Sequence, residues 1–90
     1  MISITLRTVT RDGDEREYEI TPKVQVAFER EFKVGMGKAF QQEQKMEYVY
    51  WLAWKAAQAE GEVVKPFDGW LDTIKTVEIK DVRDPLSSEG

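Results

Sequence analysis

Apolar and polar residues alternate along the first twenty positions of the chain. Ile2, Ile4 and Leu6 are separated by Ser and Thr, a pattern typical of a strand with one buried face. The cluster at 11–14 contains Asp-Gly, which is a strong signal for a tight hairpin turn. The pattern therefore predicts a β-hairpin over residues 1–20, and helices must cover its apolar face because an isolated hairpin is marginal in water.

A helical period replaces the alternation after residue 20. Thr21 and Pro22 favour a helix start, since Thr caps the first turn and Pro fits the first helical position. Apolar residues then recur at helical spacing up to residues 33–34, and Gly35 is expected to follow the helix as its C-terminal cap. Residues 35–38 are a predicted flexible joint that leads into 39–44, as a separate short helix or as the first turns of the next one.

The strongest helical pattern, over residues 46–60, is the predicted centre of the fold. Alanine, leucine and long polar residues favour helix in its second half, and Gly61 is placed to end it. One stripe of this helix collects Met46, Val49, Tyr50, Ala53, Ala56 and Ala57. Large aromatic residues also occupy the opposite side, so that side is covered either by the same chain or by another molecule.

The remainder of the chain predicts a short third helix over 66–74 and a brief extended segment over 77–79. The predicted architecture is a single α+β domain over residues 1–80, with a β-hairpin at 1–20 and a helical part at 21–80. This domain is an N-terminal hairpin packed on about three α-helices around a long central helix. Residues 81–90 are polar and are predicted to form a flexible tail.

The amino-acid composition narrows the range of possible functions. The chain has no Cys and no His, so thiolate chemistry and the commonest general base and metal ligand are missing. Thirteen basic against seventeen acidic residues give a net charge of −4, which disfavours a phosphate-backbone partner. No apolar run approaches the length of a membrane span. We therefore expect no enzymatic activity, no cofactor or metal, no nucleic-acid partner and no membrane.

The aromatic residues of the long helix leave two interpretations open. In the first, Tyr48, Trp51 and Trp54 belong to the core, with helices on one side and the hairpin on the other. In the second, Tyr48 and Trp51 form an exposed anchor for a partner, with Lys55 beside Trp51, because aromatic anchors are common at protein interfaces. The second interpretation predicts seven partner-binding residues: Met36, Phe40, Met46, Tyr48, Trp51, Trp54 and Lys55.

Over residues 21–86 the order of motifs resembles the tail assembly chaperones of long-tailed double-stranded DNA bacteriophages. The most specific matching pieces are the Leu-Ala-Trp centre at 52–54 and the Phe-Asp-Gly-Trp-Leu-Asp-Thr-Ile block at 67–74. Around them lie Phe28-Glu-Arg-Glu-Phe32-Lys33, Met46-Glu-Tyr-Val-Tyr50, Gly61, Val77-Glu-Ile79 and Asp84-Pro85.

The resemblance implies a non-enzymatic chaperone that binds the tape measure protein and keeps it soluble before the tail tube polymerises around it. It further implies action in the host bacterial cytoplasm and absence from the mature virion. Because family members are often made in two lengths, a frameshifted longer form of the chain is a candidate partner. A second copy of the chain is another, since an exposed aromatic groove can also be covered by self-association.

Two other functions compete with this interpretation. A small acidic inhibitor or antitoxin-like module would bind a basic partner through its carboxylates, and its affinity would fall steeply with salt. A helix-turn-helix-like regulatory domain would bind duplex DNA, against which the negative charge argues.

Overall fold

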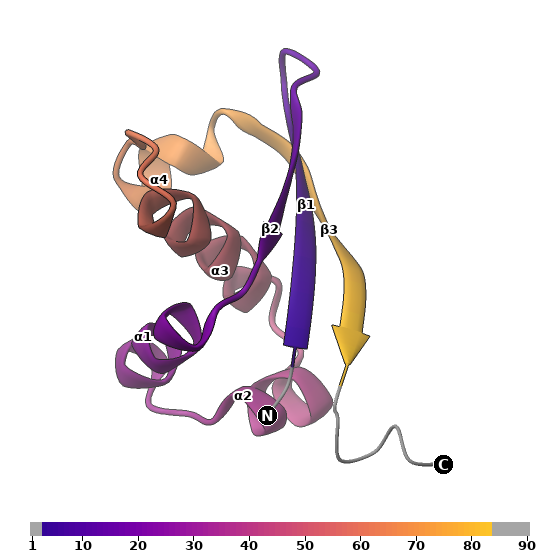
Figure 1. Cartoon of the computed structure of the whole chain (residues 1–90), viewed down its shortest axis with the longest axis vertical. Helices are drawn as coiled ribbons and strands as arrows, with labels where there is room; N and C mark the ends of the chain where they lie inside the picture. Colours follow the sequence, from indigo (N-terminus) through magenta and orange to yellow (C-terminus); the bar gives the residue numbers. More distant parts are fainter. Residues whose placement is uncertain (1–2, 84–90) are drawn as a thin grey trace.

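The computed structural model describes residues 3–83, in which an antiparallel sheet of three strands is packed against helices. The strand order is β2-β1-β3, and the helices lie on one side of the sheet (Figure 1). The elements are β1 (Ser3–Thr10), β2 (Glu15–Glu19), α1 (Pro22–Phe32), α2 (Met36–Lys38), the π-helix η1 (Ala39–Glu43), α3 (Met46–Ala59), α4 (Phe67–Leu71) and β3 (Ile74–Arg83). The predicted α+β class, with a hairpin packed on helices around a long central one, is confirmed.

The predicted hairpin is formed by β1 and β2. Leu6 faces Tyr18 across the two strands, and Thr8 faces Arg16. In the turn, Gly13 adopts φ 94° and the backbone N–H of Thr10 donates to the carbonyl of Asp14 at 2.9 Å. Glycine suits this position because a residue with a Cβ rarely adopts that conformation. The alternation places Ile4 and Leu6 against the helices, while Arg7 on the other face contacts Glu15 at 2.5 Å and Glu78 at 2.6 Å.

Strand β3 corrects the predicted C-terminal organisation. Where the sequence indicated a brief extended segment at 77–79, the chain forms a ten-residue strand that pairs antiparallel with β1. Arg83 lies opposite Ser3 at one end, and Ile74 lies opposite Thr10 at the other. Residues 74–80 therefore belong to the sheet rather than to a helical part, and residues 81–83 are strand rather than tail. The free edge of β1 supplies the backbone partners, and Val77 supplies buried apolar contact. The other residues predicted as tail, 84–90, lie outside the described part.

Helix α1 begins where the sequence predicts and ends at Phe32, close to the predicted end at 33–34, but with a different cap. The Thr21 side chain accepts a hydrogen bond from the backbone N–H of Val24, and Pro22 occupies the first turn. The predicted capping role of Gly35 is wrong, because Lys33 itself adopts the left-handed conformation with φ 57° and donates its N–H to the Glu29 carbonyl. Gly35 is instead the extended residue before α2, whose first N–H, from Met36, donates to the Glu29 side chain at 2.9 Å.

The segment 36–43 is separate from the long helix. After one turn of α2 it continues as η1, which ends at Gln44 in the left-handed conformation. Helix α3 then starts at Met46 and ends in a Schellman motif. In that motif Gly61, at φ 94°, donates its N–H to Gln58, and Glu62 donates to Ala57. The predicted capping role of Gly61 is confirmed.

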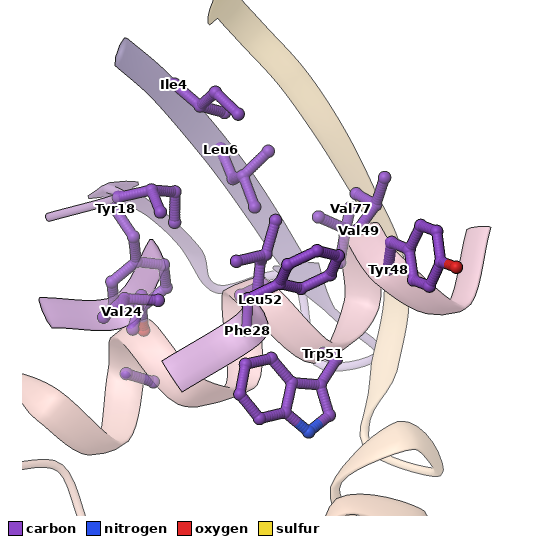
Figure 2. Packing of buried hydrophobic residues seen from close by; sticks show 14 of the residues in the cluster. Ile4, Leu6, Tyr18, Val24, Phe28, Tyr48, Val49, Trp51, Leu52 and Val77 are labelled. Atoms are coloured by element: carbon purple, nitrogen blue, oxygen red, sulfur yellow. The ribbon is translucent and has the colours of Figure 1, made fainter. Parts of the chain in front are cut away.

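Helix α3 is the spine of the core and is covered on both sides by its own chain. Leu52 is fully buried and points toward Leu6 of β1, whereas Trp51 lies on the other side of the helix (Figure 2). That other side packs against α1, whose Phe28 is also fully buried. The fold therefore agrees with the first interpretation, in which the aromatic residues of the long helix belong to the core.

Candidate functional site

The aromatic side chains form one continuous cluster across α1, α3 and α4. We call it the aromatic cluster and define it as Phe28, Phe32, Tyr48, Trp51, Trp54, Phe67 and Trp70. Phe28 and Tyr48 meet edge to face, with ring centroids 5.0 Å apart, and Phe32 meets Trp51 in the same way at 5.5 Å. Such tilted contacts are the favourable geometry for aromatic pairs. The cluster therefore joins the helices to one another.

The exposed-anchor interpretation of Tyr48 and Trp51 is wrong. Tyr48 retains 4% of its accessible surface and Trp51 retains 8%, because Phe28 and Phe32 of α1 cover them. Met36, which was predicted to add an adaptable surface, is also buried, at 3%. A helical wheel of residues 46–60 alone cannot show this cover, since the residues that provide it belong to another helix.

The polar atoms of the cluster are also engaged. The Tyr48 hydroxyl donates a hydrogen bond to the Glu43 carboxylate, and this bond, together with burial, raises the pKa of the phenol. Trp54 is half-buried, and its indole Nε1 donates to the Lys65 carbonyl at 2.8 Å, which ties the connection between α3 and α4 to the spine. Trp54 therefore has a clear structural role.

Lys55 lies beside the tryptophans, as the sequence predicted. Its ammonium group is 6.0 Å from the Trp51 ring centroid and 5.8 Å from that of Trp54, and it donates to the Gln58 side chain at 3.2 Å. The side chain is half-buried and also reaches a hollow between α1 and the C-terminal half of α3. Lys55 thus links the core to an accessible surface.

That hollow, which we call the α1/α3 groove, has a volume of about 510 Å³. Its apolar residues include Val26, which is 45% exposed although α1 buries Val24 and Phe28. The full lining is Pro22, Lys23, Val24, Val26, Ala27, Arg30, Lys55 and Ala59. Of these, only Lys55 was predicted from the sequence. The groove could have been recognised in the sequence from Val26, because this apolar residue lies outside the stripe formed by the buried residues of the helix.

A second hollow lies between η1, the start of α3 and β3, and we call it the Met46 hollow. It has a volume of about 280 Å³ and is lined by Phe40, Gln44, Lys45, Met46, Val49 and Ile79. It brings together two predicted residues, Phe40 and Met46, the latter 54% exposed. Ile79, 46% exposed, was missed because the pairing of β3 with β1 was not predicted.

The two hollows have similar linings. Their linings combine apolar side chains with Lys, Arg and Gln and contain no carboxylate or hydroxyl group. Within residues 3–83 no group of three or more potential acidic metal ligands comes together. No helix in the same range is long and apolar enough to cross a membrane. Comparison of the chain with protein families, with curated proteins and with solved structures finds no match.

Proposed function

We propose that the chain is a phage tail assembly chaperone that binds an apolar helical segment of the tape measure protein. The observation that carries the proposal is the α1/α3 groove, where Val26 and Ala27 leave apolar surface uncovered next to the sealed aromatic cluster. A groove between two helices suits a third helix, whose apolar stripe would fill it with side chains spaced three and four residues apart.

The chemistry of the proposed partner explains why a small acidic protein would serve as its chaperone. A long helix with an apolar stripe aggregates when the stripe is exposed, and a bound protein that covers the stripe prevents this. The chain's net charge of −4 would add solubility to the complex. No catalytic group is needed for this task, and the chain would act in the host bacterial cytoplasm and leave before the virion matures.

The motifs behind the resemblance have structural roles in this chain. Leu52 and Ala53 are fully buried, Trp54 holds the α3–α4 connection, and Trp70 is buried in the core. These motifs support a shared fold rather than a shared contact surface. We accordingly place the proposed partner in the α1/α3 groove and not on Tyr48 and Trp51, which α1 covers.

Co-expression with the tape measure protein of the same phage tests the proposal. We expect the tape measure protein to remain in the soluble fraction and to be captured with the tagged chain, and to aggregate when the chain is omitted. Val26→Asn should reduce capture, because it places an amide in the apolar part of the groove.

Val63→Asn is the matched control, since Val63 is fully exposed in the α3–α4 connection and does not line the groove. This variant should capture the tape measure protein as the unchanged chain does. A tape measure protein that stays insoluble and uncaptured in the presence of the unchanged chain would refute the proposed function. The other expected partners, a second copy and a longer form of the chain, stay predictions.

A further inference from the structure

We infer that the α1/α3 groove selects an amphipathic helix whose apolar stripe is flanked by acidic side chains. The inference rests on the proposed function and specifies the charge of the bound segment. Its basis is the composition of the lining, where three cationic residues, Lys23, Arg30 and Lys55, surround the apolar residues and no carboxylate is present. A cationic rim is notable in a chain that carries more acidic than basic residues.

Two of the cations lie on the same face of α1 as the apolar residues of the groove. Lys23, Val26, Ala27 and Arg30 follow the spacing i, i+3, i+4, i+7, so they share one face of α1. Val24 and Phe28, which are buried, belong to the neighbouring face. The two cations are separated by about 10 Å along the helix axis, with the apolar pair between them. Lys55 approaches from α3 on the other wall.

None of the three cations has a carboxylate partner among residues 4–81. The ion pairs described there engage Arg7, Arg16 and Lys80 with glutamates. Lys55 is held by two indole faces and by the neutral side chain of Gln58, and these contacts leave its charge uncompensated. The rim is therefore available to carboxylates of another molecule.

An occupant that fills the groove also displaces water from this rim, so its flanking charges affect its affinity. Acidic residues seven positions apart on one flank would face Lys23 and Arg30, and an acidic residue on the other flank would face Lys55. Each solvent-exposed ion pair strengthens association by roughly 1.4- to 5-fold. At a middle value of about 2.2-fold per pair, three pairs together give about tenfold. Lysine on the same flanks would be repelled, which adds to the discrimination.

Two fluorescent 18-residue peptides with the same Leu/Ala stripe, one flanked by Glu and one by Lys, provide the test. Fluorescence anisotropy at low salt should show the Glu peptide binding at least about tenfold more tightly. The double variant Lys23→Glu/Arg30→Glu should lose or invert this preference. The double variant Lys38→Glu/Lys75→Glu makes the same change in net charge away from the groove and should keep it, and circular dichroism confirms that both variants fold.

Equal affinities of the two peptides for the unchanged chain would overturn the inference. So would a preference that survives Lys23→Glu/Arg30→Glu, or one that is lost equally in the Lys38→Glu/Lys75→Glu control, since net charge alone would then explain it. Dodecanoate binding to the unchanged chain without any peptide binding would assign the groove to a small anionic amphiphile and overturn the inference as well.

The inference and the proposed function can fail separately. If the tape measure protein is captured as well by Lys23→Glu/Arg30→Glu as by the unchanged chain, the charge selection is refuted and the proposed function stands. If the Glu peptide binds in a rim-dependent way and the tape measure protein is not captured, the groove chemistry stands and the proposed function is refuted.

Discussion

Replacing Trp51 by alanine tests whether the aromatic cluster is core. The side chain retains 8% of its accessible surface and lies 5.5 Å from Phe32, 6.1 Å from Phe28 and 6.0 Å from Trp54, measured between ring centroids. A buried tryptophan removes roughly 150–250 Å² from water, and the cavity left by truncation adds to the lost transfer free energy. We expect Trp51→Ala to lower the free energy of unfolding by about 4 kcal/mol.

The expected loss is large compared with the total stability of such a domain, which is about 5–15 kcal/mol. Urea unfolding followed by circular dichroism at 222 nm measures it, since a change in midpoint at constant slope reports stability. Trp51→Phe should lose less, because the phenyl ring fills part of the site. Val63→Ala, at a fully exposed position, should change stability by no more than about 0.5 kcal/mol.

A loss below about 1 kcal/mol for Trp51→Ala would refute the reasoning, because only an exposed tryptophan is removed so cheaply. It would imply that α1 does not cover this side of α3 in solution. The exposed-anchor interpretation would then return, and partner capture by Trp51→Ala would be the measurement to repeat.

Two further predictions concern the C-terminal end of α3 and the connection between α3 and α4. Gly61→Ala should lower stability by about 1 kcal/mol in thermal unfolding, because an alanine is strained at φ 94°. The strain is the whole effect, since no atom lies within 4 Å of the added methyl group. An unchanged melting temperature would mean that the Schellman motif does not persist. Tyr18 donates to Glu62 at 2.8 Å, and burial first, then this hydrogen bond, raises the pKa of its phenol above the ordinary value of 10. The neutral phenol is thus favoured in the folded state, so its stabilisation is complete below pH 10 and is lost as pH rises further. Tyr18→Phe should make urea stability flatter between pH 9 and about 11, and a curve as steep as that of the unchanged chain would contradict the assignment.

Short-range sequence signals predicted the features whose determinants lie within a few residues of one another. The hairpin turn at Gly13, the start of α1 at Thr21 and Pro22, and the end of α3 at Gly61 all follow from local dihedral preferences and caps. Gly35 is the exception, because Lys33 already adopts the left-handed conformation and ends α1 two residues earlier.

Features that depend on distant partners were missed or left open. Beyond Ile79, strand β3 is mostly polar, and its extent is set by pairing with β1, about seventy residues earlier in the chain. Among the predicted binding residues, the structure brings Phe40 and Met46 together in the Met46 hollow and places Lys55 on the α1/α3 groove. It buries Met36, Tyr48 and Trp51.

By itself, the sequence determined the α+β class, the hairpin, the two main helices and the chain's content of apolar and charged side chains. Only the tertiary structure decided which of those side chains remain available to a partner. The physical reason is that exposure depends on what packs against a surface: Phe28 and Phe32 cover Trp51, while nothing in the described chain covers Val26 to the same extent. A helical wheel assigns faces to one helix, and the packing of the others decides which face is buried.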